Sequence, residues 1–188
     1  MSILDIRVLG DPILRQPTTP VGAMTEELQV LIDDMFETMH HARGIGLAAP
    51  QVGRTERLAV VEVDDQPLVL VNPEIVERAG RAKGEEGCLS IPDIYADVER
   101  PDTVTVRALD RNFAPFEIEA TDLLARCLQH EIDHLDGKLF LDYLSVLKRT
   151  AALAKWKLEA SKYPGYIRRV ALETPEDRRG HEHPDEEL

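Results

Sequence analysis

Three helices and a group of short strands are predicted from the pattern of hydrophobic and polar positions along the chain. Between residues 25 and 41, apolar side chains occur at i, i+3, i+4, i+7 and i+11, which places them on one helix face. Thr25 precedes this run as a candidate N-cap, and Gly44 follows it. Terminal signals predict a second helix over residues 121–137 and a third over residues 145–162, which a Tyr-Pro-Gly sequence ends.

After the first helix the pattern changes to short runs rich in β-branched residues. Several runs alternate polar and apolar positions, and charged or Gly/Pro turns separate them, as is typical of antiparallel strands. The predicted strands cover residues 57–63, 67–72, 103–109 and 116–120. This order of elements predicts an α+β fold, in which a mostly antiparallel sheet packs around a central helix, with an N-terminal and a C-terminal helix.

The composition limits the classes of function. With 188 residues, 43% hydrophobic and 30% charged, the chain fits one domain, which we expect to cover residues 1–170. The net charge of −13 disfavours DNA as a partner, because a phosphate backbone must be neutralised by a basic surface. No apolar run approaches the roughly 18 to 20 residues that span a membrane. Two cysteines are too few for a disulfide framework, which predicts reduced thiols and a cytoplasmic location.

Charge is distributed unevenly toward the end of the chain. Residues 148–170 contain seven basic residues and one acid, a net charge of +6, whereas residues 173–188 contain seven acids and two arginines, a net charge of −5. We expect residues 171–188 to form a disordered acidic tail. The basic helix is the one candidate contact for a polyanion, and a solvated helix face is the simpler interpretation of it.

The second helix contains the sequence His130-Glu131-Ile132-Asp133-His134. Histidines four residues apart project from one helix face and can bind one metal ion. Glu131 directly follows the first histidine, where it can take a proton from water rather than ligate the metal. The central helix therefore carries a candidate metal site that needs a third ligand.

The third ligand decides which class of enzyme the motif indicates. The third histidine of metzincins is excluded, because Phe140 occupies its position. Cys127 lies about 10.5 Å along the helix axis from His134, at about 1.5 Å per residue, which is too far for one ion. Glu159 on the third helix is the ligand that a thermolysin-like site would use. Cys88 is favoured, because a thiolate completes a tetrahedral site with two imidazoles and leaves the fourth position to water.

The first helix is followed by a third candidate segment, Gly44-Ile45-Gly46-Leu47-Ala48-Ala49-Pro50-Gln51. Its small side chains would let an extended peptide lie against exposed backbone donors and acceptors. Taken alone, such a segment is more often a glycine-rich turn before a strand. It lacks the Gly-Lys-Ser/Thr of a phosphate-binding loop.

Together, three strings of the sequence resemble the signature motifs of the peptide deformylases. They are the segment from Gly44 to Gln51, the string Glu86-Gly87-Cys88-Leu89-Ser90, and the string Gln129-His130-Glu131-Ile132-Asp133-His134. Their order and approximate separation match that family, and the similarity extends over about residues 2–158. The resemblance implies an α+β fold and removal of the N-formyl group from the methionine that begins nascent polypeptides, with release of formate.

The resemblance also implies a role for each matching residue. The divalent metal ion would be held by Cys88, His130 and His134, and Glu131 would be the general acid and base. The Gln51 amide and the Leu89 backbone N–H would stabilise the oxyanion. Gly46 would pair with the substrate main chain, and the pocket for the methionine side chain would be lined by Ile45, Glu86, Leu123 and Cys127.

Partners and cofactors follow from the same resemblance. Fe²⁺ is the expected metal, because similar enzymes are ferrous, and Zn²⁺, Ni²⁺ or Co²⁺ also suit thiolate and imidazole ligands. N-formylmethionyl peptides would be the substrates, and the basic C-terminal helix is a candidate ribosome contact. Tyr95 stands where some bacterial members carry a peptide-binding arginine, so that contact is not carried over. Two alternatives stay open from the sequence: a zinc metallopeptidase with Glu159 as third ligand, and a non-catalytic metal- or peptide-binding module.

Overall fold

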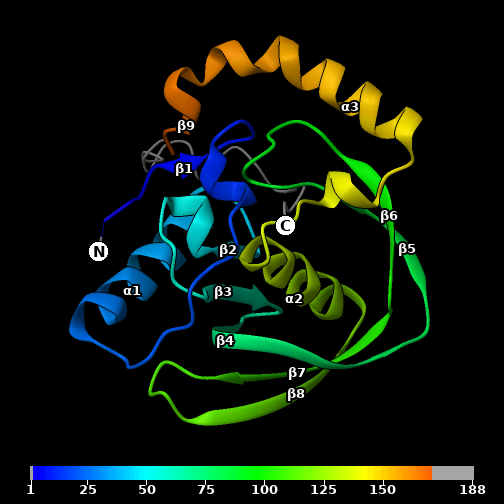
Figure 1. Ribbon diagram of the computed structural model, residues 1–188. Coiled ribbons are helices and arrows are strands. Elements are labelled where there is room, and N and C mark those ends of the chain that lie inside the picture. Colours follow the sequence, from blue (N-terminus) through cyan, green and yellow to red (C-terminus); the bar gives the residue numbers. More distant parts are fainter. Residues whose placement is uncertain (1, 171–188) are drawn as a thin grey trace.

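Helix α2, Asp122–Leu135, crosses the middle of the protein, and the other elements surround it (Figure 1). The structure is a computed structural model and describes residues 2–170. Helix α1, Glu26–His41, and helix α3, Val146–Glu159, lie outside the central helix. The predicted α+β fold is therefore confirmed, whereas the predicted acidic tail, residues 171–188, lies outside the described residues.

The largest sheet has five antiparallel strands in the order β2-β3-β4-β7-β8. The strands cover Gly46–Ala48, Leu58–Val63, Gln66–Ala79, Thr103–Leu109 and Pro115–Thr121, respectively. Strand β3 is buried on both faces. Its alternate side chains point to opposite sides of the sheet, and each side is covered by a hydrophobic core. Ala59 and Val61 belong to the core that includes α2, whereas Leu58 and Val60 belong to the core that includes α1. The sheet thereby separates the two helices and fixes the position of α2.

Strand β4 continues well past Asn72, where the predicted strand ends. The prediction ends there because a proline cannot donate to a strand ladder. In the structure Asn72 has a φ of 51°, and the pairing with β7 shifts register around Pro73. The Asn72 side chain exchanges two hydrogen bonds of 2.8 Å with the backbone of Val21, which stabilises this irregular conformation.

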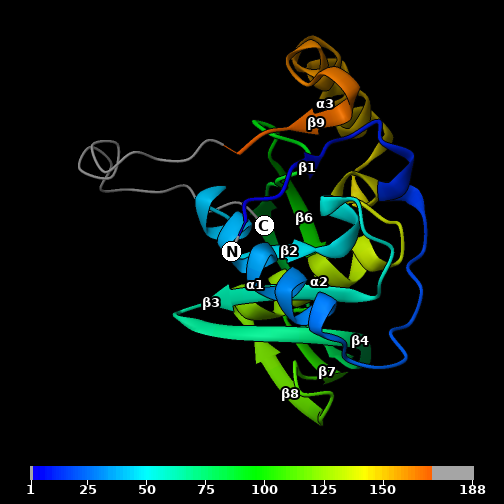
Figure 2. The same cartoon turned by 90° about the vertical axis from the view of Figure 1, so that its left-hand side faces the viewer.

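Two smaller antiparallel sheets are absent from the sequence prediction. Strand β5, Ala82–Glu86, pairs with β6, Ala96–Arg100. Strand β1, Ile6–Arg7, pairs with β9, Ile167–Arg168, and the two lie side by side below α3 (Figure 2). The β5 and β6 sequences are mostly polar, and two-residue strands are too short to show any period, so hydrophobic patterning does not detect either pair.

The helices begin and end close to the predicted positions. The Thr25 hydroxyl caps α1, and a glycine with a φ of 73°, Gly137, follows α2. Helix α3 is shorter than predicted, because residues 160–162 form a 3-10 helix. Trp156 is the one buried side chain of α3, and its indole N–H donates to the Leu9 carbonyl at 3.1 Å. Helix α3 is therefore a peripheral helix attached to the N-terminal segment.

Short 3-10 helices connect the larger elements, at Pro12–Arg15, Ala49–Val52, Phe140–Tyr143, Ala160–Lys162 and Pro164–Tyr166. The second of them carries Gln51. Among residues 2–170, no helix has the length and apolar character needed to cross a bilayer.

Candidate metal centre and active site

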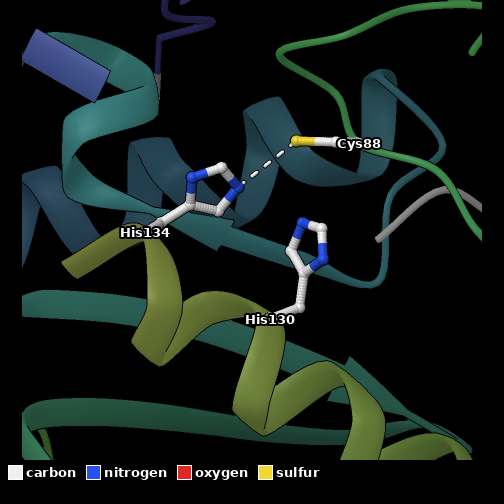
Figure 3. A group of neighbouring side chains, drawn as sticks. All are labelled: Cys88, His130 and His134. Atoms are coloured by element: carbon white, nitrogen blue, oxygen red, sulfur yellow. Dashed lines mark hydrogen bonds between the residues drawn. The ribbon is translucent and has the colours of Figure 1, made fainter. Parts of the chain in front are cut away.

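Cys88, His130 and His134 meet in the interior of the protein (Figure 3). The two histidines project from α2, and the cysteine comes from the turn that follows β5. All three side chains are buried, and one candidate ligand atom of each lies within 4.8 Å of the others. The Cys88 Sγ is 3.2 Å from His134 Nε2. The structure thus brings together the three residues that the sequence analysis proposes as metal ligands.

The donor set and its surroundings fit a divalent cation. Among the described residues, the buried His130 Nε2 and His134 Nδ1 have no hydrogen-bond partner, and neither has either carboxylate oxygen of Glu131. An unpaired buried polar atom costs about 1 to 3 kcal/mol, so a cluster of them indicates a site for polar ligands. One thiolate and two imidazoles are ligands that suit Zn²⁺ and Fe²⁺.

Burial controls the protonation of two groups in this cluster. It raises the pKa of the Glu131 carboxyl well above its ordinary value, because an ionised carboxylate is poorly solvated there. Burial, followed by the neighbouring His130, lowers the pKa of His134. Burial therefore favours the protonated, uncharged form of Glu131 and the neutral form of His134, which is the form that binds metals.

Glu86, the last residue of β5, is held by three donors. Its carboxylate accepts from Arg100 at 2.5 and 2.9 Å and from Arg126 at 2.6 Å, and it lies 3.2 Å from His130 Nδ1. Burial opposes ionisation of Glu86, but the hydrogen bonds from His130 and Arg100 outweigh it and hold its pKa well below the ordinary value. Ionised Glu86 accepts the Nδ1–H of His130, which leaves Nε2 as the atom available to a metal.

Arg100 connects this carboxylate to Asp133, which lies one helical turn after His130 on α2. The guanidinium donates to Asp133 at 2.8 Å, the Tyr143 hydroxyl donates to the same carboxylate at 2.8 Å, and the Arg100 guanidinium lies 4.7 Å from the Tyr143 ring centre. Sequence reasoning missed this network, since it treats Glu86 as a pocket wall and does not single out the arginines. The sequence gives one indication of this network: Asp133 is an acid within the HExxH motif that has no role as metal ligand or general base.

Gln51 directs its amide nitrogen toward the cysteine. Its oxygen accepts the Ala48 N–H at 2.8 Å, which fixes the orientation of the amide. The amide nitrogen lies 3.2 Å from Ser90 Oγ and 3.7 Å from Cys88 Sγ. Leu89 follows the cysteine in the same turn and is buried. The two residues proposed to bind the oxyanion therefore both lie next to Cys88.

Gly46 in β2 lies directly against Glu131. A Cβ at Gly46 would come within 3.0 Å of the Glu131 carboxylate and of Cys127 Sγ, so only glycine leaves room there. Of the proposed pocket residues, Ile45 and Leu123 line one surface pocket of about 350 Å³, and Cys127 is buried beside Gly46. The structure therefore gathers these positions on the β2 side of α2.

The alternative third ligand, Glu159, is not part of this cluster. It lies on the peripheral helix α3 and pairs with Lys162. The buried cluster contains Cys88 instead, and beside it stands a carboxyl group that can move a proton. The fold and the site together define a metal-dependent hydrolase of the α+β class.

Comparison with known proteins specifies the family. The model of the polypeptide deformylase family matches residues 3–150, and the chain belongs to that family. Its members are metal-dependent hydrolases that remove the formyl group from nascent polypeptides. The activity expected from the sequence motifs is therefore confirmed at the level of the family.

Relatives and solved structures agree with this assignment. Peptide deformylases from Hydrogenovibrio crunogenus and Alkalilimnicola ehrlichii are 54% and 57% identical over 165 and 153 residues, covering 86% and 79% of this chain and 98% and 86% of those proteins. A crystal structure of a peptide deformylase from Legionella pneumophila has a TM-score of 0.82 and 50% identity, covering 87% of this chain and 99% of its own. One from Synechococcus elongatus, in complex with actinonin, has a TM-score of 0.79 and 47% identity, covering 82% and 86%.

Proposed function

We propose that this chain hydrolyses the N-formyl group of N-formylmethionyl peptides at one divalent cation held by Cys88, His130 and His134. The observation that carries the proposal is the buried cluster of these side chains beside Glu131, with imidazole and carboxylate atoms that lack partners among residues 2–170. Family membership supplies the substrate class.

Glu131 carries the proton transfers in this proposal. A bound divalent cation would act as a Lewis acid on water and on the formyl oxygen. Glu131 takes a proton from the attacking water, whose oxygen bonds to the formyl carbon. It then gives that proton to the methionine nitrogen as the C–N bond breaks, so that the amine leaves uncharged. The raised pKa of Glu131 supports both transfers, because the carboxyl must hold the proton between them.

Gln51 and the Leu89 N–H stabilise the negative charge that develops on the formyl oxygen. The Ala48 contact supports this role for Gln51, because it turns the NH₂ end of the amide toward the cysteine. A preorganised donor of this kind contributes on the order of 10² to 10³ to the rate.

The substrate peptide lies along β2 in this proposal. Gly46 pairs with its main chain, and the missing side chain at that position keeps the approach to Glu131 open. Ile45, Leu123 and Cys127 contact the methionine side chain, together with Glu86. The burial of Cys127 and its contact of 3.6 Å from Sγ to the Ile45 carbonyl support this placement.

Fe²⁺ is the cation that we assign to the site in the cell, with Zn²⁺, Ni²⁺ or Co²⁺ as substitutes. The mixed thiolate and imidazole donors support this set of metals. Metal analysis of protein purified without oxygen tests the assignment, and zinc as the predominant metal in such protein would contradict it.

The decisive experiment compares Glu131→Gln with a matched control, Glu159→Gln, in metal-loaded protein. We expect Glu131→Gln to abolish formate release from a formyl-Met peptide while the metal content stays near one ion per chain. Glu159→Gln should retain both activity and metal, because Glu159 lies on α3 and pairs with Lys162. Formate release at the normal rate by Glu131→Gln would refute the mechanism.

For the basic helix α3 we propose contact with ribosomal RNA. Lys148 and Lys157 are exposed on α3. Lys148 follows the exposed apolar side chains Val146 and Leu147, and Lys157 precedes the exposed Leu158. Replacing both lysines by glutamate in the full chain should weaken cosedimentation with ribosomes, and the loss should be larger at low salt. The same change at Lys83 on β5 is the control. Equal binding by all variants would exclude this role.

We also propose that residues 1–170 form one catalytic domain that works in the cytoplasm, where formylated nascent chains are made. The pairing of β1 with β9 supports a single domain, because it joins the two ends of the described chain. Neither cysteine is in a disulfide, which agrees with a reducing compartment.

A further inference from the structure

The segment that follows the family match reaches the turn that carries Cys88. Arg168, at the end of β9, donates a hydrogen bond of 3.0 Å from Nη1 to the carbonyl oxygen of Leu89. We propose that Arg168 is a positioning residue, which holds the Leu89 backbone so that its N–H meets the oxyanion. This inference rests on the proposed function, because it needs Leu89 as the oxyanion donor.

Three successive carbonyl groups of the turn are held by different parts of the chain. The Cys88 oxygen accepts the Ile91 N–H at 2.8 Å, within the turn itself. The Leu89 oxygen accepts the guanidinium described above, and the Ser90 oxygen accepts the Leu9 N–H at 2.8 Å. The Cys88–Leu89 peptide group, which carries the proposed oxyanion donor, is therefore held within the turn, and the two peptide groups that follow it are held by Arg168 and Leu9.

Strand β9 is itself fixed firmly enough to transmit this restraint. Ile167 pairs with Arg7 of β1, and the Val8 N–H donates to the Tyr166 carbonyl at 3.0 Å (Figure 2). The Tyr166 ring also covers Gly10 so closely that a Cβ at Gly10 would overlap it. The guanidinium thus approaches the turn from a strand with a defined place in the fold.

A charged donor to a carbonyl makes a stronger hydrogen bond than a neutral donor. Here it restricts the Leu89–Ser90 peptide plane, which adjoins the Cys88–Leu89 plane that carries the oxyanion donor. The oxyanion charge develops only in the transition state, so a displaced N–H costs rate rather than substrate affinity. Loss of Arg168 should therefore lower kcat and leave KM unchanged. The neighbouring Arg169 is exposed and gives a control with the same change of charge.

The test uses full-length, metal-loaded protein and the variants Arg168→Met, Arg168→Lys and Arg169→Met. Methionine keeps an apolar stem and removes the donor. We expect Arg168→Met to lower kcat about tenfold with KM, metal content and unfolding temperature unchanged. Arg168→Lys should recover most of the rate, because an ammonium can donate to the same carbonyl. Arg169→Met should behave as wild type.

Normal kcat in Arg168→Met would overturn the inference. The inference would also be overturned if Arg168→Met lost metal or folded protein in proportion to its loss of kcat, or if Arg169→Met lost as much kcat as Arg168→Met. If Arg168→Met does not fold, Arg168→Gln replaces it, because its shorter neutral side chain removes the charged hydrogen bond: a lowered kcat at unchanged KM and metal content supports the inference, and a wild-type kcat overturns it. The wild-type protein is assayed alongside. A metal-loaded wild type that releases no formate would refute the proposed function itself, whereas active wild type with fully active Arg168→Met refutes only the role of Arg168.

Discussion

Replacing Gly46 by alanine tests whether close packing around Glu131 sets the geometry of the site. The new Cβ would lie 2.8 Å from Glu131 Cδ and 2.9 Å from Cys127 Sγ, and it would overlap Glu131 Oε1. The backbone of β2 cannot move away freely, because Gly46 is paired with Val61 of the next strand. The carboxylate must therefore move.

The size of the movement follows from ordinary contact distances. Carbon atoms pack at about 3.5 Å, so an approach of 2.8 Å requires a shift of about 0.7 Å. A misplacement of about 1 Å in an active site can cost about 10² in rate. We expect kcat to fall about 30- to 100-fold, which corresponds to about 2 to 3 kcal/mol of activation free energy. Overpacking should also lower the free energy of unfolding by about 1 to 3 kcal/mol.

Formate release from a formyl-Met peptide measures kcat, and metal analysis and urea unfolding are run on the same protein. Metal content should stay at the wild-type level, because none of the candidate ligands is displaced directly. Gly22→Ala is the matched control, since a Cβ at Gly22 meets nothing within 4 Å. A kcat for Gly46→Ala within threefold of wild type would show that Glu131 tolerates displacement and would refute the reasoning.

Three further predictions concern stability and metal binding. Glu86→Gln should raise the metal dissociation constant about 10- to 100-fold in chelator competition. It should also lower the free energy of unfolding by about 3 to 5 kcal/mol, because Arg100 and Arg126 lose the charge of a carboxylate that they share. Wild-type values in both assays would contradict this prediction. Burial raises the pKa of Asp142, but hydrogen bonds from Arg15 and the Leu139 N–H outweigh burial, so the pKa lies below its ordinary value. The ionised carboxylate therefore stabilises the fold fully above pH about 4, and this stabilisation is lost as the pH falls below that value. The difference in unfolding temperature between wild type and Asp142→Asn should accordingly disappear below that pH, and a difference that persists in acid would exclude the ion pair as its cause. Removing the metal with a chelator should lower the free energy of unfolding by about 2.7 kcal/mol, compared with protein at a free metal concentration of 100 times the dissociation constant. An unchanged unfolding temperature would argue against a bound ion.

Features that depend on local spacing could be predicted from the sequence. The i, i+3, i+4 pattern and the Thr25 cap locate α1 within one residue, because burial of one helix face and satisfaction of the first N–H groups are local requirements. Strand β3 could be found from its continuous apolar run. The histidines of α2 could be paired because four residues make just over one helical turn, and Cys88 could be added because its donor chemistry complements theirs.

Features that depend on distant charged residues could not be predicted. Strands β5 and β6 carry several charged residues, a pattern that predicts a solvent-exposed surface. In the structure, however, Glu86 and Arg100 of these strands are buried against each other. Nothing in the spacing of the sequence indicates that Arg126 shares the same carboxylate, or that Arg168 reaches Leu89. Such contacts follow from the tertiary fold, because a charge is buried only where its partner arrives from another segment.

The segment from His130 to His134 shows how the fold offsets the free-energy cost of burying several polar side chains in one helix. Ile132 packs into the apolar core, but the four polar side chains around it are all buried. Asp133 and His130 are connected to Arg100 and Glu86, and these pairs offset the cost of burial, whereas Glu131 has no partner among the described residues. The burial that makes Glu131 costly is also what raises its pKa above the ordinary value of a carboxyl group. The ion-pair network therefore stabilises α2 directly beside His130, and this allows one unpaired carboxyl group to remain where the reaction needs it.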